Sequence, residues 1–310
     1  MGPTLDIIIV NWNSGDLLRS CLQSITSALH ESFTLLRVVV VDNASSDESL
    51  RGLDGLELPL TILSNRSNRG FGRACNQGAL ESRADYLLML NPDTLLEADS
   101  LRIPLEWLER DANQSVAVAG IQLIDSNAGV ALSCARFPRF ATYFWTATGL
   151  DRLLPGLSLG YRMVEWDHSE SRDVEHIMGA FYLVREAVFQ ALGGFDEDFF
   201  VYFEDIDLSQ RIAARGHRSH FLAQAQAYHK GGGTTAQIPA RRLACFLRGK
   251  LRYARKHHGR IGFLLVAALM VLVELPLRCL AFLVARRPKE ALATLGAGVL
   301  LCVVEPSCDD

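Results

Sequence analysis

Short, nearly unbroken runs of Val, Ile and Leu alternate with helical patterns over the first 120 residues. Unbroken apolar runs are typical of strands that are buried on both faces, as in a parallel sheet. The predicted strands are 5–10, 36–41, 60–63, 85–90 and 116–120, and the predicted helices between them are 15–29, 46–52, 71–83 and 98–110. Strand, helix and strand repeated at this spacing predict an α/β fold with a mostly parallel, Rossmann-like sheet flanked by helices.

The middle of the chain divides into an irregular and a regular part. Residues 121–175 contain several Pro and Gly with scattered aromatic residues, and they predict a loop-rich insertion. Residues 176–230 predict a buried strand over IMGAFYLV, a short helix, and an acidic patch, FDEDFFVYFEDIDL, that leads into another helix. Two short strands that end at Tyr228 and His229 are expected after it.

The C-terminal part of the chain is a basic and apolar tail. A basic amphipathic stretch at 240–260 precedes an apolar stretch at 261–285 and a second apolar run at 292–304. The 261–285 stretch exceeds the roughly 20 residues that span a bilayer, but Glu274, a Pro and Arg278 interrupt it. Glu274 and Arg278 are four residues apart and are expected to pair on one helix face. An interfacial or re-entrant insertion, a true span, and a soluble helical lid or dimer face all remain open.

The 310-residue chain carries 31 Lys and Arg against 35 Asp and Glu, a formal net charge of −4. No acid occurs between Leu208 and Val273, where 12 of the basic residues lie. An acidic body joined to a basic, acid-free segment favours a polyanion or an anionic membrane surface as partner. The seven scattered Cys form no CxxC, and the N-terminus lacks a signal-peptide pattern, so we expect reduced thiols and a cytoplasmic location.

Polar residues follow three of the predicted strands at their carboxyl ends, where parallel sheets bind ligands. They are Asn11, Asn13, Asp42, Asn43, Asn91 and Asp93. A carboxylate at Asp42 can accept the N3–H of a uracil or thymine ring, although Asp is also a common turn or cap residue. Asp93 can hold a divalent cation that bridges a diphosphate, although Asn-Pro-Asp is also a common turn.

Two further clusters lie in the second half of the sequence. Glu204 and Asp205 at a predicted helix start can supply a general base, but acids are favourable at helix N-termini without any function. His229 at a strand end can complete a metal site or contact a phosphate, although a lone His is more often a surface or core residue. The motifs GxGxxG and GxxxxGK[ST] are absent, which argues against a nicotinamide dehydrogenase and a P-loop NTPase.

Taken in order, these clusters and their flanking motifs resemble glycosyltransferase family 2, the inverting enzymes of the GT-A fold. The resemblance covers about residues 4–235 and is carried by VNWNSGDLLRSCLQSI, VVVVDNASSD, NRGFGRACNQG, LMLNPDT, GAFYLVREAVFQALGGFDEDFF and YFEDIDLSQRIAARGH. The LNPD form and the GGFDEDFFVYFEDIDL stretch are most similar to bacterial rhamnosyltransferases of surface-polysaccharide and cell-wall assembly. The resemblance implies inverting transfer of a sugar, rhamnose above all, from a dTDP or UDP donor to a saccharide linked to polyprenyl diphosphate.

The resemblance also implies roles for individual residues. Asp205 matches the expected catalytic base, with Glu204 as its support, while Asp93 and His229 match metal or diphosphate ligands. The residues expected to bind the nucleotide-sugar are Asn13, Asp42, Asn43, Asn68, Asn76 and Asn91. One departure is that Asn91 replaces the first acid of the family's DxD motif, so the cation, Mg²⁺ or Mn²⁺, is expected to depend mainly on Asp93, the diphosphate and water.

These implications define an expected organisation. Residues 1–239 form a GT-A domain, with a nucleotide-binding half at 1–120 and an acceptor half at 121–239, and residues 240–310 form a helical membrane-associating tail. The expected partners are a nucleotide-diphosphate-sugar, a lipid-linked saccharide and an anionic membrane surface at the cytoplasmic face of a bacterial cell, but no nucleic acid. A nucleotidyltransferase and a non-catalytic nucleotide-sugar or glycan-binding protein are the alternatives. The former should carry a Gly-rich, basic loop where NWNSGD stands.

Overall fold

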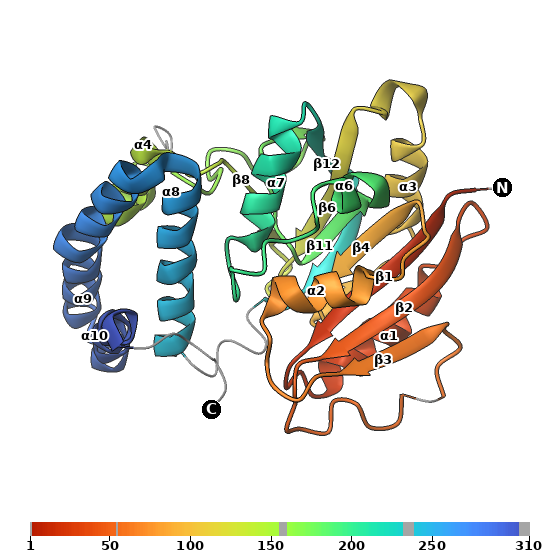
Figure 1. Cartoon of the computed structure of the whole chain (residues 1–310), viewed down its shortest axis with the longest axis horizontal. Coiled ribbons are helices and arrows are strands. Elements are labelled where there is room, and N and C mark those ends of the chain that lie inside the picture. Colours follow the sequence, from red (N-terminus) through yellow and green to blue (C-terminus); the bar gives the residue numbers. More distant parts are fainter. Residues whose placement is uncertain (1, 54, 155–159, 232–238, 304–310) are drawn as a thin grey trace.

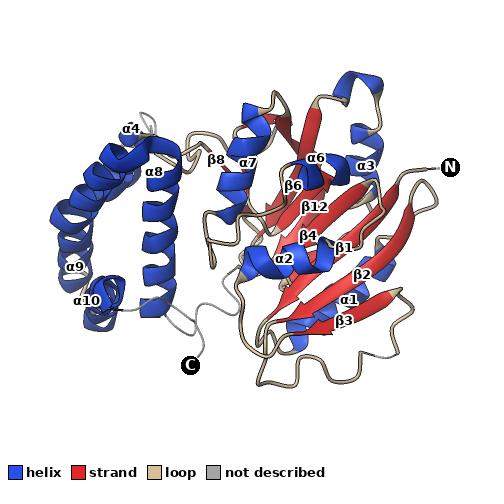
Figure 2. Ribbon diagram, in the orientation of Figure 1, coloured by secondary structure: helices blue, strands red, loops and turns tan. Residues whose placement is uncertain are grey.

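The computed structural model describes residues 2–53, 55–154, 160–231 and 239–303, so the end of the glycine run after His229 and the predicted boundary at 239/240 lie at or outside its limits. Helices cover both faces of a mixed sheet, and further helices form a separate group beside it (Figures 1 and 2). The strands of its main path, in spatial order, are β3 (Leu60–Ser64), β2 (Thr34–Asp42), β1 (Thr4–Asn11), β4 (Tyr86–Leu90), β11 (Phe181–Arg185), β6 (Val116–Ile124), β12 (Arg218–His229) and β5 (Thr94–Leu96). The predicted α/β fold with a helical C-terminal segment is confirmed.

The first four strands of this order form the parallel half of the sheet. β1 pairs in parallel with β2 and β4, and β2 pairs in parallel with β3, at the positions of the predicted strands. Ile7 and Ile9 enter one core cluster, and Ile8 and Val10 enter the cluster on the opposite face. Because both faces are buried, these strands are continuous in Val, Ile and Leu instead of alternating with polar residues.

The other half of the sheet is mixed. β11 runs antiparallel to both β4 and β6, and β12 runs parallel to β6. β12 is one strand of 12 residues where two short strands were predicted, and its register shifts between Leu222 and Gln226. β5 pairs antiparallel with the end of β12, so that Thr94 lies opposite His229. This pairing brings the segment that follows β4 next to the end of β12.

Helices bury the two faces of the sheet. Those that contribute to the core cluster of Ile7 are α1 (Asp16–Ser27) and α3 (Arg102–Leu108), and those that contribute to the cluster of Ile8 are α2 (Phe71–Ala79), α6 (Glu186–Ala191) and α7 (Glu204–Ala214). Figure 1 shows α2, α6 and α7 along one face of the sheet. α7 matters most for the site, because it carries the predicted base at its first turn.

The helix predicted at 46–52 is wrong, because this segment consists of bends and turns. Asp47 explains the difference. Its Oδ1 atom accepts hydrogen bonds from the backbone N–H and the hydroxyl of Ser49, and its Oδ2 atom accepts one from the N–H of Gly15 at 2.8 Å. Side-chain bonds of this kind compete with the backbone bonds of a helix.

The segment 121–175 is mostly irregular, as predicted, but its aromatic centre forms a helix. The short elements of this segment and just after it are β7 (Val130–Ala131), β8 (Cys134–Ala135), α4 (Phe140–Thr148), α5 (Leu150–Leu153), β9 (Arg172–Val174) and β10 (His176–Ile177). Tyr143 of α4 enters a third core cluster together with Phe203, Tyr253 and Val266. The aromatic residues of this segment therefore join the sheet domain to the tail.

The tail is a folded group of helices. α8 (Pro239–Leu269) is broken at Gly259, which has φ 69° and ψ −167°, and a π-helical turn at Met270–Glu274 leads into α9 (Leu275–Val284) and α10 (Pro288–Val303). Figure 1 shows these helices as an arch beside the sheet domain. A glycine is needed at the break because other residues rarely adopt a positive φ.

Glu274 shows that the two arms of this tail fold against each other. Its carboxylate pairs with Lys250, and both side chains are buried. It also lies 3.3 Å from Arg278, so the predicted pair is confirmed. In a continuous helix Lys250 and Glu274 would be about 36 Å apart. Among the described residues, Ala240–Val284 alone is long and apolar enough to cross a membrane, but this fold-back makes it two arms instead of one rod.

Several charges of the basic, acid-free stretch pair with acids of the body. Lys256 lies 2.5 Å from Asp196 and 2.7 Å from Asp207, and Arg252 lies 3.6 Å from Asp198. The charges of Lys256 and Arg252 are thus used in part within the protein, whereas an anionic partner of the basic stretch stays a prediction. Part of the charge asymmetry along the sequence is neutralised within the fold, where the tail docks on the acidic patch.

Candidate active site

The carboxyl end of β2 forms a tight polar turn around Asp42. The side chain is 4% exposed, and its Oδ1 atom accepts hydrogen bonds from Asn11 Nδ2 at 2.8 Å and Ser45 Oγ at 2.6 Å. Its Oδ2 atom accepts one from the N–H of Ser45 at 3.1 Å. Asp42 therefore stabilises this turn, and its contact with a nucleotide base stays a prediction.

Asn13 and Asn43 hold the neighbouring loops. Asn13 adopts φ 50°, and its Oδ1 atom accepts a hydrogen bond from the N–H of Ser46 at 2.7 Å. Asn43 is buried, and its Nδ2 atom donates to the carbonyl oxygen of Gly70 at 3.1 Å, while its Oδ1 atom accepts from Asn65 Nδ2 at 2.9 Å. Asn43 thus ties the end of β2 to the Gly-rich segment.

Gly70 holds the Gly-rich segment against the loop that precedes α7. It has φ 84°, and a Cβ atom there would lie 2.3 Å from the carbonyl oxygen of Phe200, so this position requires glycine. The N–H of Phe71 donates to the same oxygen at 2.7 Å. Asn68 Oδ1 accepts the N–H of Gly70 at 3.0 Å. The predicted donor-binding loop therefore lies beside the segment that leads to the predicted base.

Asn76 is committed to the scaffold. Its Nδ2 atom donates to the carbonyl oxygen of Phe195 at 2.9 Å, and its Oδ1 atom accepts the N–H of the same residue at 2.8 Å. With both ends of the amide engaged by backbone, the geometry assigns Asn76 to anchoring the loop before α7. It gives no support to the predicted contact of this residue with the donor.

The turn after β4 brings Asp93 to His229. Asn91 donates its N–H to the carbonyl oxygen of Ala180 at 3.0 Å and accepts the N–H of Thr94 at 3.1 Å, which closes the Asn-Pro-Asp turn. Asp93 Oδ1 lies 3.2 Å from His229 Nε2, and both side chains are buried. In the described part of the chain, this Nε2 atom makes no properly directed hydrogen bond. The two predicted metal ligands are therefore neighbours.

A buried imidazole nitrogen without a hydrogen-bond partner, placed beside a carboxylate, fits a cation site. The described residues contain no group of three or more His, Cys, Asp and Glu side chains able to hold a metal ion. Asp93 and His229 would therefore supply two ligands. Oxygen atoms of a diphosphate and of water would complete the coordination, as is usual for Mg²⁺ sites.

α7 starts in strained backbone at the predicted base. Tyr202 and Phe203 have φ of 69° and 74°, which residues other than glycine rarely adopt, and such strain is concentrated at functional sites. Asp205 is partly exposed. Its Oδ1 atom accepts the N–H of Ile206 at 2.8 Å, and its Oδ2 atom accepts the N–H of Gly179 at 3.0 Å. Two backbone donors thus fix the carboxylate.

Glu204 lies in a different environment from its neighbour. It is 5% exposed, and its Oε2 atom has no hydrogen-bond partner among the described residues. Burial, and then the negative charge of Asp205, raises the pKa of Glu204 well above its usual value. Burial therefore favours the protonated form of Glu204, whereas Asp205 is the accessible group. Paired carboxyls in unlike environments are suited to different tasks in catalysis.

The segment Gly179–Ala180 joins these clusters into one site. Gly179 donates to Asp205, and Ala180 accepts from Asn91, so the base and the Asn-Pro-Asp turn lie on either side of it. The Gly70–Phe200 contact adds the Gly-rich segment from the other direction. The amino terminus lies on the side of the sheet away from the tail, so the carboxyl end of β1 and its parallel neighbours point toward the tail (Figure 1).

Asp207 is a residue of this region that no prediction singled out. It is fully buried and accepts hydrogen bonds from Arg211 Nε at 2.8 Å and His257 Nε2 at 2.8 Å, with Lys256 Nζ at 2.7 Å. Burial opposes its ionisation, but the bonds from His257, Lys256 and Arg211 prevail and lower the pKa of Asp207 to about 2. The four-residue spacing of Asp207 and Arg211 is the one signal in the sequence. The tail partners follow only from packing.

His176 was also missed. It lies on β10, between Glu175 and the apolar run that begins at Ile177, and its Nε2 atom is 3.5 Å from Asp205 Oδ2. A single His in this position carries no signal in the sequence. Its contact with Asp205 arises because β10 packs on α7.

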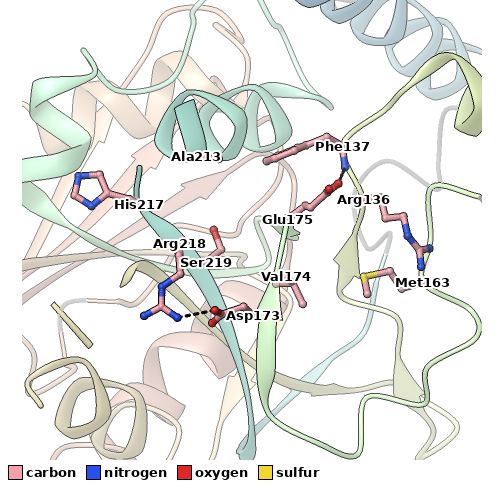
Figure 3. Close-up of a pocket in the computed structure, with 10 residues that line it drawn as sticks. All are labelled: Arg136, Phe137, Met163, Asp173, Val174, Glu175, Ala213, His217, Arg218 and Ser219. Carbon is pink, nitrogen blue, oxygen red and sulfur yellow. Dashed lines mark hydrogen bonds and ion pairs between the residues drawn. The ribbon is translucent and has the colours of Figure 1, made fainter. Parts of the chain in front are cut away.

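A cavity of about 380 Å³ lies beside the other end of α7, lined by Ala213 and by Arg218 at the start of β12 (Figure 3). Arg218 lies 2.6 Å from Asp173, and the N–H of Phe137 donates to Glu175 at 2.5 Å. No predicted site residue lines this cavity. The cavity is therefore separate from the site described above. Arg218 and Glu175 in its lining also have partners within the protein.

Known proteins are similar to this chain in sequence and in fold. Residues 6–168, just over half of the chain, match glycosyl transferase family 2. The N-acetylglucosaminyl-diphospho-decaprenol L-rhamnosyltransferase of Mycobacterium tuberculosis is 27% identical over 283 residues, which cover 84% of this chain and 86% of that protein. Rhamnosyltransferase WbbL of Escherichia coli K12 is 28% identical over 178 residues, or 56% of this chain and 62% of that protein.

Among solved structures, the mannosyltransferase PcManGT from Pyrobaculum calidifontis, in complex with GDP-Man and Mn²⁺, aligns with a TM-score of 0.57 at 17% identity. The alignment covers 99% of this chain and 89% of that one. The fold, the family match and the rhamnosyltransferase relatives agree with one another, and the predicted GT-A fold and resemblance are confirmed. The chain is a glycosyltransferase that belongs to glycosyl transferase family 2.

Proposed function

We propose that this glycosyltransferase moves rhamnose, with inversion, from a dTDP or UDP donor to a lipid-linked saccharide. The observation that carries the proposal is a series of contacts at one edge of the sheet. One part runs from the end of β2 through Gly70 to Phe200 in the loop before α7, and the other runs from Asp205 through Gly179 and Ala180 to the turn that holds Asp93 beside His229. The proposal is supported by the proximity of these segments at an edge where parallel sheets bind nucleotides.

The substrate classes rest on the relatives. The Mycobacterium tuberculosis relative is named as an L-rhamnosyltransferase acting on N-acetylglucosaminyl-diphospho-decaprenol, and the alignment extends beyond the sheet domain into part of the tail because it covers 84% of the chain. The Escherichia coli relative is also a rhamnosyltransferase. We therefore infer rhamnose as the transferred sugar and a polyprenyl-diphosphate-linked saccharide as the acceptor.

Asp205 is the proposed base. Its carboxylate is partly exposed at the start of α7 and is oriented by two backbone N–H groups. It would take the proton of the acceptor hydroxyl while that oxygen attacks the anomeric carbon opposite the leaving diphosphate. Burial favours the protonated form of Glu204, which would spare the incoming diphosphate a second negative charge. The chain itself thus contributes to catalysis a base that is already oriented by backbone N–H groups.

A divalent cation is the proposed cofactor, with Asp93 and His229 as its protein ligands. When bound, Mg²⁺ or Mn²⁺ neutralises the charge that develops on the leaving diphosphate. The Mn²⁺ complex of PcManGT supports a divalent cation in this fold. Asn91 offers a neutral carbonyl oxygen where an acid would add charge, so we expect weaker cation binding than two acids would give.

The tail is the proposed membrane contact, at the cytoplasmic face. Apolar side chains with more than half of their surface exposed lie between Gly259 and the end of α9: Ile261, Leu264, Val271, Leu272, Leu280, Leu283 and Val284. The pair of Lys250 and Glu274 folds this segment back on the part of the tail before Gly259, which favours interfacial attachment over a straight span. Flotation with anionic vesicles tests this, and retention after an alkaline carbonate wash would instead favour a span.

The transfer reaction is tested with the full chain, dTDP-L-rhamnose or a panel of UDP-sugars, and a synthetic N-acetylglucosaminyl-diphospho-prenol in detergent. We expect release of nucleoside diphosphate that requires both the lipid acceptor and Mg²⁺ or Mn²⁺. The anomeric configuration of the product, read by NMR, tests inversion. Donor binding without release in the presence of the acceptor would overturn transfer and favour a nucleotide-sugar-binding role.

A further inference from the structure

A buried row of polar groups lies behind the proposed base. His176 on β10 is 2% exposed, and its Nε2 atom is 3.5 Å from Asp205 Oδ2. Its Nδ1 atom is 3.1 Å from Ser209 Oγ, which is in turn 3.1 Å from the hydroxyl of Tyr182. Ser209 and Tyr182 are fully buried. Three separate elements, β10, α7 and β11, therefore supply one continuous chain of contacts to the carboxylate.

The direction of this chain follows from its two ends. The Asp205 carboxylate can only accept, so the opposite tautomer of His176 would place a bare nitrogen against it. Burial raises the pKa of Tyr182, so its hydroxyl keeps its proton and can donate. Tyr182 therefore donates to Ser209, Ser209 donates to His176 Nδ1, and the proton of His176 is on Nε2, which lies 3.5 Å from Asp205 Oδ2.

The charge state of His176 agrees with this direction. Burial lowers the pKa of His176, and the charge of Asp205 opposes that shift only in part, so the imidazole is neutral. The other titratable groups that act on the Asp205 carboxylate are Glu204 on the same helix, whose raised pKa favours its protonated form, Tyr161 before β9, and Tyr182. A neutral imidazole can present an N–H to Asp205 without forming a competing ion pair.

We propose that His176 is a positioning residue for Asp205, with Ser209 and Tyr182 fixing its tautomer. The N–H of Gly179 donates to the Oδ2 oxygen at 3.0 Å, and the Nε2 atom of His176, 3.5 Å from the same oxygen, limits the orientations open to the carboxylate. The proposal rests on the proposed function, because it needs Asp205 to be the base. It adds a residue behind the base whose loss should change both kcat and the pH range in which the base works.

The test compares the pH dependence of kcat for the full chain and its His176→Ala and His176→Gln variants, with dTDP-L-rhamnose and the prenyl-linked acceptor. Loss of a positioning contact is expected to lower kcat by about 10- to 100-fold in His176→Ala, with the donor KM within about 2-fold of wild type. The acidic limb of the profile should move to higher pH, because the carboxylate loses a donor. His176→Gln should recover most of both effects, because its amide N–H can replace Nε2–H.

His168→Ala is the matched control for general damage. His168 is also fully buried, bonds to the carbonyl oxygen of Trp166 and accepts the N–H of Cys134 at 3.3 Å, but it has no contact with Asp205 among the described residues. Its replacement should lower the melting temperature without moving the acidic limb. Ser209→Ala should move the limb in the same direction as His176→Ala, by a smaller amount, and it serves if His176→Ala does not fold.

Three outcomes separate this proposal from the function on which it rests. An acidic limb of His176→Ala and Ser209→Ala that coincides with wild type, while Asp205→Asn abolishes turnover, overturns the positioning role alone. Near-normal turnover in Asp205→Asn overturns the base and this role together. No turnover by the wild-type chain with any donor overturns the proposed transfer itself.

Discussion

The carboxyl edge of the sheet and the face where the tail docks use acidic residues in opposite ways, and α7 takes part in both. At the sheet edge, Asp205 is held by two backbone N–H groups and keeps access to solvent. Two residues later, Asp207 is fully buried and neutralised by three cationic or imidazole side chains. The comparison teaches that a run of acids such as EDID need not share one role. Position on the helix decides whether a carboxylate is available for chemistry or consumed in packing.

The largest expected effect comes from removing the available acid. Asp205→Asn should lower kcat by about 10²- to 10⁴-fold, because a general base contributes that much, while donor binding survives. Nucleoside diphosphate release measures the first effect, and the thermal shift on adding donor measures the second. Glu197→Gln, which changes an exposed acid of the same patch, should keep turnover within about 2-fold. An equal loss of kcat in Asp205→Asn and Glu197→Gln would contradict a specific role of Asp205 in catalysis.

The cation site gives the next largest effect. Asp93→Asn and His229→Ala should each raise the Mn²⁺ concentration for half-maximal turnover by about 10- to 100-fold or more, since ligand loss exceeds the usual cost of losing a supporting contact. Asn91→Asp restores the missing acid and should lower that concentration. If Asn91→Asp has no effect while the other two variants do, Asn91 lies outside the coordination sphere.

Replacement of the buried acid, Asp207, should lower the free energy of unfolding. Removing one partner from a buried ion network costs about 3–5 kcal/mol, so Asp207→Asn should destabilise the protein by roughly that amount and loosen the tail. Asp198→Asn removes the exposed pair with Arg252 at the same interface and should cost about 0–1 kcal/mol. Denaturant unfolding and limited proteolysis of the tail measure both. Similar costs for the two variants would contradict the role of Asp207 as a buried clamp, by which we mean its contacts with Arg211, Lys256 and His257.

The pH dependence of that clamp has a defined sign. The pKa of Asp207 is lowered from 3.8 to about 2, so its contribution to stability is present above pH 3.8 and is lost as the pH falls toward 2. The difference in unfolding free energy between wild type and Asp207→Asn should therefore shrink over this window. A difference that stays constant across it would show that the carboxylate charge does not matter.

Among the predicted site residues, the smallest effect on turnover is expected at Glu204. Because its pKa is raised by burial and by the charge of Asp205, Glu204→Gln should keep kcat within about 10-fold of wild type. The protonated side chain stabilises the fold below its unfolded pKa of 4.5, and this stability is lost as pH rises toward the raised folded value, at about 1.4 kcal/mol per pH unit. Wild type should therefore lose stability relative to Glu204→Gln with rising pH. A flat difference would mean that Glu204 is ionised in the fold.

The strands of the parallel half and their order with the helices follow from local pattern. Runs such as LDIIIV and VVVVD can be buried on both faces in only a few ways, and these strands formed where expected. The segment 46–52 had a plausible helical pattern, but the side chain of Asp47 bonds to Ser49 and Gly15 and makes turns instead. Asn76 lies in a motif that the resemblance associates with the nucleotide-sugar donor, yet both ends of its amide form hydrogen bonds with the backbone of Phe195.

The sequence by itself determined the α/β alternation, the polar ends of the strands and the family, because these depend on residue type and spacing along the chain. Only the tertiary structure decided which charges stay available. Packing of β10 on α7 placed His176 behind Asp205, and the reversal at Gly259 set Lys250 against Glu274. Such contacts join residues 24 or more positions apart, and their strength depends on burial and partner geometry, which no local pattern contains.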